Sequence, residues 1–168
     1  MIYDLVPASS PILGTKLDNF DFANPPIDSI QLAKDLFETM LHNKAMGLSA
    51  NQVGLPYRVF AIAANPGIVA FNPRVVDQTT EEIYLDEACA TYPGMALKVK
   101  RPKMVKIRYF EPNGNTVTQK FIGLTARIIL HEMDHLNGIN FTQRANKVHL
   151  DRALRQQKTL IRQRKNLK

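Results

Sequence analysis

The spacing of hydrophobic residues along the chain predicts two amphipathic helices separated by a strand-rich region. Apolar residues recur at intervals of three and four over 28–43, the period of a helix that is buried on one face. Gly47 gives a stop signal for this helix. A second helix is predicted over 123–138, where Gly138 fits the position that follows a helix end. Prolines interrupt residues 1–26, which we expect to form an irregular arm.

The region between these helices has the composition of β-structure. Apolar and β-branched residues gather in segments that are bounded by Gly, Pro, Asn and Asp. Strands are predicted at 57–64, 68–76, 82–90 and 98–110. The turn sequence Glu-Pro-Asn-Gly at 111–114 separates 103–110 from 115–122, so these two segments are predicted to form a hairpin.

A third helix is predicted over 148–167, near the end of the chain. Leu150, Leu154 and Ile161 form a narrow apolar stripe on an otherwise basic surface. Strands that follow one another, with few helices between them, favour an α+β fold over an alternating wound sheet. We expect one domain, with a catalytic part over 1–147 and a basic C-terminal helix over 148–168 that belongs to it.

Composition and charge exclude several classes of protein. The 168 residues are 45% hydrophobic and 22% charged, as in an ordinary globular domain. One cysteine excludes an internal disulfide framework, and the sequence indicates neither a membrane-spanning run nor a secretory signal. The net charge of +7 lies entirely in residues 146–168, since the rest of the chain is neutral. Any attraction to nucleic acid is therefore expected from the tail.

The strongest chemical signal is the sequence His-Glu-Met-Asp-His at 131–135. On a helix, His131 and His135 lie one above the other, so both can bind one metal ion. Glu132 between them can act as a general base toward water on that ion. A chance occurrence on a solvated helix is the alternative, but the apolar run before the motif favours burial.

The third metal ligand does not follow from this motif. No glutamate occurs after Glu132, and position 141 is Phe, so the common downstream ligands are absent. The remaining candidates by residue type are His42, His149, Asp151 and Cys89. Cys89 is the best of them, because a thiolate with two imidazoles suits Zn²⁺ or Fe²⁺ and leaves a position open for water. Taken alone, a single cysteine is more often a small buried apolar residue.

Three segments together resemble the signature motifs of the peptide deformylase family. They are Gly-Leu-Ser-Ala-Asn-Gln-Val-Gly at 47–54, Glu-Ala-Cys-Ala-Thr-Tyr-Pro at 87–93 and His-Glu-Met-Asp-His-Leu-Asn-Gly at 131–138. The resemblance extends over about residues 1 to 145, and the tail is comparable to the C-terminal helix of bacterial-type members. It implies that family's α+β fold, with mixed or antiparallel sheets around the central HExxH helix and a helix toward each end.

The resemblance also implies an activity and roles for the site residues. The family removes the formyl group from the N-terminal methionine of new proteins. In the matching positions, Cys89, His131 and His135 would bind one divalent metal ion. Glu132 would take a proton from the metal-bound water and later deliver it to the leaving amine. The Gln52 side chain and the Ala90 backbone N–H would donate hydrogen bonds to the oxyanion that forms when water attacks the formyl carbon. The implied physiological ion is Fe²⁺, with Zn²⁺, Ni²⁺ or Co²⁺ as alternatives.

Substrate contacts follow from the resemblance in the same way. The peptide backbone and the methionine side chain would contact Met46, Gly47, Leu48, Glu87, Ala88, Leu124, Arg127 and Ile128. The family alignment also suggests an ion pair between Arg101 and Asp134, with two solvated charges as the alternative. A tight site around the formyl group can reject bulkier acyl groups.

This sequence departs from the family's usual motifs at a few positions. Ala88, Ala90 and Thr91 stand where Gly, Leu and Ser are common, and Ala45 and Ser49 replace Gly and Ala. The Ala90 change keeps the backbone donor but removes side-chain bulk near the metal. These departures put substrate preference in doubt and suggest an atypical branch, for which a phage origin is one hypothesis.

The resemblance implies that the binding partners are N-formylmethionyl nascent peptides. It also implies a monomer without membrane association in the cytoplasm of a bacterial or phage-infected cell. The basic tail could also dock on the ribosome, where such peptides emerge, or simply pack on the body as a solvated helix. Two other functions remain open from the sequence. One is an HExxH endopeptidase, and the other is a degraded family member that is kept as a ribosome-binding module.

Overall fold

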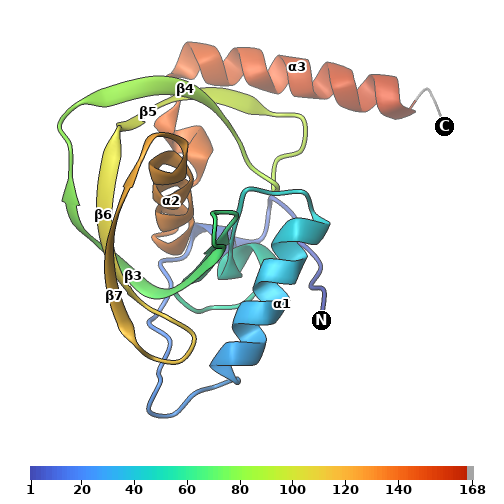
Figure 1. Cartoon of the computed structure of the whole chain (residues 1–168). Coiled ribbons are helices and arrows are strands. Elements are labelled where there is room, and N and C mark those ends of the chain that lie inside the picture. The colour runs from blue at the N-terminus through green and yellow to red at the C-terminus, as the bar shows by residue number, and fades with distance from the viewer. Residues whose placement is uncertain (166–168) are drawn as a thin grey trace.

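The computed structural model describes residues 1–165, and Figure 1 shows how its two sheets curve around one helix. The helices are α1 (Ser29–His42), α2 (Gly123–Leu136) and α3 (Lys147–Lys165), with short 3-10 turns η1 (Pro11–Gly14), η2 (Ala50–Val53) and η3 (Phe141–Arg144). The strands are β1 (Gly47–Ser49), β2 (Val59–Ile62), β3 (Ile68–Gln78), β4 (Glu82–Ala88), β5 (Ala96–Pro102), β6 (Met104–Phe110) and β7 (Thr116–Ile122). The predicted α+β fold class is confirmed.

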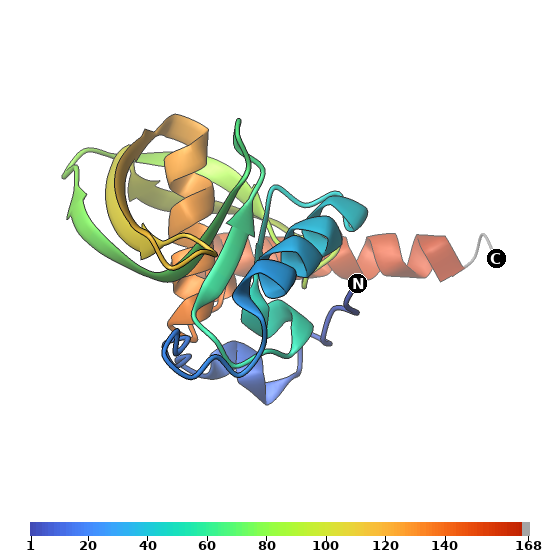
Figure 2. The same ribbon diagram turned by 60° about the horizontal axis from the view of Figure 1, so that its bottom comes forward.

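Both sheets are antiparallel. One has five strands in the order β1-β2-β3-β6-β7, and the other contains β4 and β5. The helix α2 lies inside the curve of the strands, while α1 packs on the other side of β1 and β2 (Figure 2). The predicted irregular arm before α1 contains only η1 as a helical turn.

Strand β2 shows how alternation builds the core between α1 and α2. All four of its residues are buried, because each face of the strand meets a different helix. Phe60 and Ile62 join the cluster that contains Ile129 of α2. Val59 and Ala61 join the cluster around α1. This buried strand fixes both helices relative to the sheet and so places α2 beside β1.

The helix predictions for α1 and α2 are confirmed. Asp28 caps α1 by accepting a hydrogen bond from the Gln31 backbone N–H at 2.7 Å. The helix ends at His42, so the predicted stop at Gly47 lies inside β1 instead. Helix α2 ends at Leu136 and is followed by Gly138 with φ of 70°. That left-handed conformation is the reason why glycine follows the helix end.

The prediction of one strand over 98–110 is wrong. The chain turns at Lys103, where β5 ends and β6 begins, and the two strands belong to different sheets. The inward and outward alternation continues through the bend, with Val99 and Val105 both buried, so periodicity could not reveal it. Pro102, which cannot donate a backbone hydrogen bond, was the available signal.

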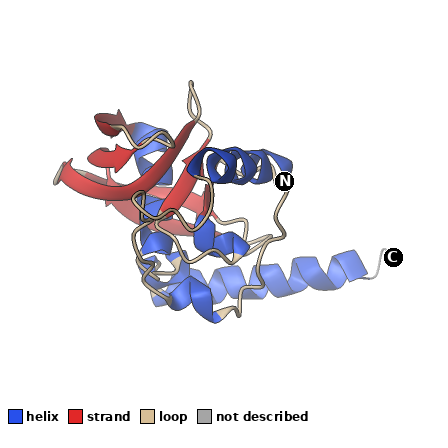
Figure 3. Cartoon of the chain, turned by 90° about the horizontal axis from the view of Figure 1, so that it is seen from below, coloured by secondary structure: helices blue, strands red, loops and turns tan. Residues whose placement is uncertain are grey.

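Helix α3 packs on β5, and its Ala153 shares a buried cluster with Leu97 of β5 and Phe141 of η3; the end of the helix extends past the body of the protein (Figures 1 and 3). Its contact face includes Ala153, which is buried, and Gln157, whose amide donates to the Pro93 carbonyl at 3.0 Å. The predicted apolar stripe is therefore only partly correct, because Leu154 and Ile161 are exposed. The face of α3 that packs on the body contains Ala153 and Gln157, which lie about one position along the chain from the predicted stripe. Residues 166 and 167 of the predicted helix lie outside the described residues.

No helix within residues 1–165 combines the length and the apolar character that crossing a bilayer requires.

Substituting Gly138 with Ala is expected to lower the stability of the fold. A Cβ atom there would lie 2.7 Å from the carbonyl oxygen of Gly14, and the residue has φ of 70°. Gly114→Ala is the matched control, since its φ is 85° but the nearest atom to its Cβ is a Phe22 ring carbon at 3.7 Å. Both variants bear a conformational cost of about 1–2 kcal/mol. Urea unfolding should show a further loss of unfolding free energy in Gly138→Ala only. Equal stabilities of the two variants would contradict the close packing of Gly138 against Gly14.

Candidate metal centre

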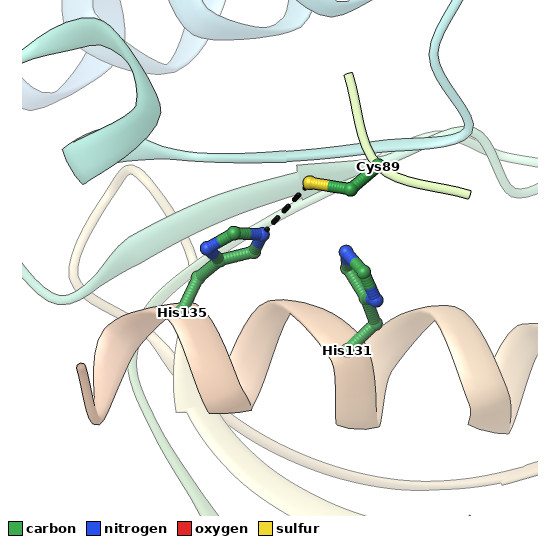
Figure 4. A group of neighbouring side chains, drawn as sticks. All are labelled: Cys89, His131 and His135. Carbon is green, nitrogen blue, oxygen red and sulfur yellow. Dashed lines mark hydrogen bonds between the residues drawn. The ribbon is translucent and has the colours of Figure 1, made fainter. Parts of the chain in front are cut away.

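Three side chains converge on one point at the inner face of α2. His131 and His135 lie one turn apart on that helix, and Cys89 faces them from the loop that follows β4 (Figure 4). Their ligand atoms all lie within 4.8 Å of one another, and Cys89 Sγ is 3.2 Å from His135 Nε2. All three are buried, with 6%, 7% and 2% exposure for Cys89, His131 and His135. The sequence placed Cys89 within a strand, but β4 ends at Ala88.

The donor set fits one divalent transition metal ion. A thiolate and two imidazoles at these separations match three-ligand catalytic sites, in which a further position stays open. The Nδ1 atom of His131 contacts Glu87 Oε2 at 3.1 Å, which leaves its other ring nitrogen for a metal. The alternative ligands His42, His149 and Asp151 are exposed and lie outside this cluster.

The electrostatics of the cluster favour a positive charge at this point. Burial disfavours a charged His131, but hydrogen bonds with Cys89 and Glu87 raise its pKa to about 10. The pKa of His135 falls to about 3, because the ring is buried and lies beside His131 and Arg101. His135 is therefore a neutral donor, and the negative groups around His131 would attract a metal cation as they attract a proton.

Glu132 lies directly beside this cluster and has a free carboxylate oxygen. The residue is 3% exposed, and within residues 1–165 its buried Oε2 atom has no hydrogen-bond partner. Burial raises the pKa of Glu132 to about 7, which is the range of an effective general base at neutral pH. Its position depends on Gly47 in β1, where a Cβ atom would lie 2.4 Å from Glu132 Oε1.

Gly47→Ala is expected to reduce turnover strongly, because the added methyl group would displace the Glu132 carboxylate. The same Cβ would also lie 2.9 Å from a methyl carbon of Ile128, so little room remains for relaxation. We expect the rate of hydrolysis to fall by about 10²-fold, which is the loss expected when a catalytic group is displaced by about 1 Å. The measurement is kcat for an N-formylmethionyl peptide, the substrate that the family resemblance leads us to expect. Gly14→Ala, which meets no atom within 4 Å, is the control, and an unchanged kcat in Gly47→Ala would contradict the argument.

The Gln52 side chain is held from both ends. Its Oε1 atom accepts the Ser49 backbone N–H at 2.9 Å. Its Nε2 group donates to Thr91 Oγ1 at 3.0 Å and lies 3.5 Å from Cys89 Sγ. The amide nitrogen therefore faces the ligand cluster. Within the described chain, the Ala90 backbone N–H donates to no protein acceptor, and Ala90 lines the same cavity.

A buried ionic network supports the cluster from behind. Glu87 pairs with Arg101 Nε at 2.6 Å and with Arg127 Nη1 at 2.7 Å. Arg101 also reaches Asp134 at 2.8 Å, so the suggested Arg101–Asp134 ion pair is confirmed. Burial raises the pKa of Glu87, but hydrogen bonds from His131 and Arg101 outweigh it and lower the pKa to about 2. The network thus carries a fixed negative charge next to His131.

The structure brings most of the expected substrate residues together around one cavity. Its volume is about 660 Å³. The lining includes Met46, Gly47, Gln52, Glu87, Ala88, Cys89, Ala90, Leu124, Arg127, Ile128, His131 and Glu132. Leu48 does not line it, because its side chain is fully buried in the core around α1. The Arg127 guanidinium turns away to Glu87 and to the carbonyls of Ile83 and Val99, so only its stem remains for a ligand.

Sequence reasoning missed several residues of the site. Thr91 orients Gln52, and Arg144 pairs with Asp134 through its guanidinium. Tyr92 and Met95 also line the cavity. Thr91 lies within the second motif, at 87–93, and a polar residue among the small apolar residues there could have indicated a role in the site. Nothing local marks Arg144, because its partner lies on another element.

Comparison with known proteins agrees with this geometry. The family model described as polypeptide deformylase matches residues 2–151. The chain belongs to the peptide deformylase family. The cluster of Cys89, His131 and His135 therefore occurs in a fold that belongs to the same family as the motifs that predicted it. A peptide deformylase from Cytophaga hutchinsonii is 32% identical over 157 residues, which cover 88% of this chain and 84% of that protein.

Other members of the deformylase family match less of their own length or at lower identity. The peptide deformylase of Microchaete diplosiphon is 38% identical over 122 residues, which cover 69% of this chain and 65% of that relative. A crystal structure of a Synechococcus elongatus peptide deformylase in complex with actinonin superimposes with a TM-score of 0.84 at 30% identity, over 90% of this chain and 85% of that one. A crystal structure of a Legionella pneumophila peptide deformylase superimposes with a TM-score of 0.85 at 25% identity, over 98% of each chain.

Proposed function

We propose that this chain hydrolyses the formyl amide of N-formylmethionyl peptides and releases formate. The observation that carries the proposal is the buried Cys89–His131–His135 cluster with the free Glu132 carboxylate beside it, opening into an apolar cavity. Membership of the deformylase family supports the same reaction. The intact cluster argues against a degraded member, and the lack of a downstream glutamate argues against an endopeptidase.

One divalent metal ion would be held by Cys89, His131 and His135, and we propose Fe²⁺ as the physiological ion. Zn²⁺, Ni²⁺ and Co²⁺ suit the same donors. When bound, the ion would polarise the formyl carbonyl and lower the pKa of attacking water. The thiolate would place negative charge on a bound ion, and the contact of Glu87 Oε2 with His131 Nδ1 at 3.1 Å restrains the ring while leaving its other nitrogen for the metal.

The protein's own groups divide the remaining work. Glu132 takes a proton from the attacking water and later delivers it to the amine as the C–N bond breaks, which its pKa of about 7 suits. The Gln52 amide and the Ala90 N–H donate to the oxygen on which negative charge develops. Because Ser49 and Thr91 fix the Gln52 amide, this donor needs no reorganisation during the reaction.

Substrate recognition would use the two strand edges and the apolar side chains at the cavity. We propose that the peptide backbone lies along Met46, Gly47 and Leu48 of the β1 region, with Glu87 and Ala88 of β4 opposite. The methionine side chain would occupy the space beside Leu124, Ile128 and the stem of Arg127. Ala88 and Ala90 change the space around the reacting group, and we expect them to alter substrate preference rather than the reaction.

The proposal is tested by formate release from formyl-Met-Ala-Ser with protein that is metallated under anaerobic conditions. Release of formate with one metal ion bound per chain is the expected result. Acetyl-Met-Ala-Ser is the matched substrate and should be hydrolysed far more slowly, because a site that fits a formyl group, which has only a hydrogen beyond its carbonyl, can reject a bulkier acyl group. Cleavage of internal bonds in unformylated peptides would support an endopeptidase instead. A fully metallated protein with no activity on either substrate would overturn the proposal.

We also propose that the basic face of α3 docks on the ribosome, and that the protein works in the cytoplasm as a monomer. Arg155, Lys158 and Arg162 are exposed and lie on α3. Changing all three to Gln should weaken ribosome co-sedimentation. It should also reduce the salt dependence of binding, by about one unit of slope for each phosphate that the helix no longer neutralises. The activity on free peptides should not change.

Lys34, Lys106 and Lys120 provide the matched control for this test. They are exposed and lie on the body of the protein, on α1, β6 and β7. Changing these three lysines to Gln removes the same charge but should leave co-sedimentation unaltered. Equal losses in the two triple variants would show that net charge alone is responsible, and would contradict docking through α3.

A further inference from the structure

The turn η2 contains a second buried amide, Asn51, directly before Gln52 in the sequence. Both side chains are almost completely buried, with 0% exposure for Asn51 and 1% for Gln52. The Asn51 Nδ2 group donates to the main-chain carbonyl of His135 on α2 at 2.7 Å. A carbonyl oxygen can only accept, so this contact requires the nitrogen side of the amide to face α2. Asn51 therefore connects η2 to the backbone of one of the three candidate metal ligands.

The Ser49 hydroxyl holds the other side of this amide. Ser49 is fully buried, and its Oγ atom lies 2.8 Å from Asn51 Oδ1 and 3.0 Å from Gln52 Oε1. One hydroxyl hydrogen is thus shared by two amide oxygens, in a three-centre arrangement that is common near helix ends. Gln52 Oε1 also accepts the Ser49 backbone N–H, whereas within residues 1–165 Asn51 Oδ1 accepts no other hydrogen bond. Asn51 therefore depends on this hydroxyl more than Gln52 does.

These contacts form one continuous link between the proposed oxyanion donor and the helix that carries both histidines. The link runs from the Gln52 amide through the Ser49 hydroxyl and the Asn51 amide to the His135 carbonyl. That carbonyl belongs to the last turn of α2, where carbonyl groups lack the usual partner within the helix. The Asn51 contact thus fixes the separation of two segments that are 84 residues apart in the sequence.

This separation matters for the stabilisation of an oxyanion. The oxygen on which charge develops must lie near the metal ligands and within hydrogen-bond reach of the Gln52 amide at the same time. Thr91 fixes Gln52 relative to the loop that carries Cys89, since its Oγ1 accepts from Gln52 Nε2 at 3.0 Å. Asn51 fixes the same turn relative to α2. A displacement of about 1 Å between such groups can lower a rate by about 10²-fold.

We propose that Asn51, held by the Ser49 hydroxyl, is a positioning residue that keeps the Gln52 amide at a fixed place relative to the metal ligands on α2. This inference rests on the proposed function, in which Gln52 donates to the developing oxyanion. Asn51 does not line the cavity, so it acts on the reaction through Gln52.

The first test is Asn51→Leu, which keeps a similar volume but removes both hydrogen-bonding groups. The His135 carbonyl still accepts the Gly138 backbone N–H at 3.1 Å, so it does not lose its last donor. At full zinc occupancy, we expect kcat for formyl-Met-Ala-Ser to fall by about 10–100-fold, the usual effect of losing a group that supports a metal ligand. KM should change by less than about 3-fold, because the link serves the transition state. An unchanged kcat, or a loss that lies in KM, would overturn the proposal.

Ser49→Ala tests the hydroxyl alone and introduces the side chain that is common in the family at this position. Asn51 keeps its bond to His135, so kcat should fall by only about 2–10-fold, the factor that corresponds to one hydrogen bond. Thr39→Val is the matched control. It removes a buried hydroxyl on α1 that donates to the Asp35 carbonyl at 2.7 Å and does not line the cavity. Equal losses of kcat in the two variants would overturn the role given to Ser49.

A double-mutant cycle asks whether Asn51 acts through Gln52. Gln52→Ala removes the donor itself and should lower kcat by about 10²–10³-fold. Adding Asn51→Leu to that variant should lower kcat by less than about 3-fold more, because no donor remains to be positioned. A second full loss on the Gln52→Ala background would overturn the proposal.

A measurement that does not depend on turnover separates this inference from the proposed function. Hydrogen exchange of the Gln52 side-chain amide is followed by NMR in zinc-loaded protein. We expect exchange to become about 10-fold faster in Asn51→Leu and in Ser49→Ala, because local opening becomes easier, and to stay unchanged in Thr39→Val. Unchanged exchange at Gln52 in the first two variants would overturn the positioning role, even in an active enzyme. An inactive wild-type protein whose variants exchange faster would overturn the proposed function but support the link from Asn51 to Gln52.

Discussion

Changing Glu132 to Gln is expected to reduce formate release by about 10²–10⁴-fold, the range for loss of a positioned general base. The substitution keeps the size of the side chain but removes its ability to take a proton. Because Cys89, His131 and His135 supply the metal donors, metal content should stay at the wild-type level. The two measurements are the rate of formate release at saturating peptide and the metal bound per chain.

Glu81→Gln is the control for the Glu132 experiment. It makes the same chemical change at an exposed residue whose carboxylate contacts only Lys103, at 3.4 Å, among the described residues. We expect wild-type turnover from it. Full activity of Glu132→Gln would remove Glu132 from the proton path. Loss of its metal would make Glu132 a support of the donors instead.

The elements that surround the site were predictable where a local pattern decides the structure. The stretch 28–43 is α1 almost to the residue, because one face of that helix is buried and Asp28 caps it. The hairpin of β6 and β7 was also predictable, since Glu111 to Gly114 forms a tight turn in which the Gly114 N–H donates to the Glu111 carbonyl at 2.9 Å. In both cases the deciding interactions lie close together in the sequence.

Features that depend on tertiary contacts were not predictable in this way. The bend at Lys103 moves the chain from one sheet to the other without breaking the alternation of buried residues. The packed face of α3 is set by where β5 and Phe141 of η3 lie, which the periodicity of the helix itself does not reveal.

The chemistry of the site was predictable to different depths. The positions of His131 and His135 follow from helix geometry, so their approach was expected from spacing alone. Donor chemistry favoured Cys89 as the third ligand, and the family resemblance strengthened that choice against the simpler explanation that a lone cysteine is a small buried apolar residue. The side-chain network behind these ligands joins α2, β4, β5 and η3, and no local pattern predicts such contacts.

Glu87 is the centre of that network and carries the second large effect that we expect. Its side chain is 4% exposed and contacts two guanidinium groups and the ring of His131. Glu87→Gln would keep the shape of the side chain but remove the one negative charge that, within residues 1–165, pairs with both Arg101 and Arg127. Two buried cations would then lie close together, and His131 would lose the acceptor that orients its ring.

We expect Glu87→Gln to lower the free energy of unfolding by about 3–5 kcal/mol, as for a broken buried ion pair. We also expect metal affinity to fall by about 10–100-fold, because the orienting contact to His131 is weakened. Urea unfolding of the metal-free protein and competition with a chelator measure the two effects. Glu82→Gln is the control on the same strand, since its pair with Lys100 at 3.1 Å is exposed. Its loss should be about 0–1 kcal/mol, and equal losses in both variants would show that burial of the Glu87 network contributes nothing.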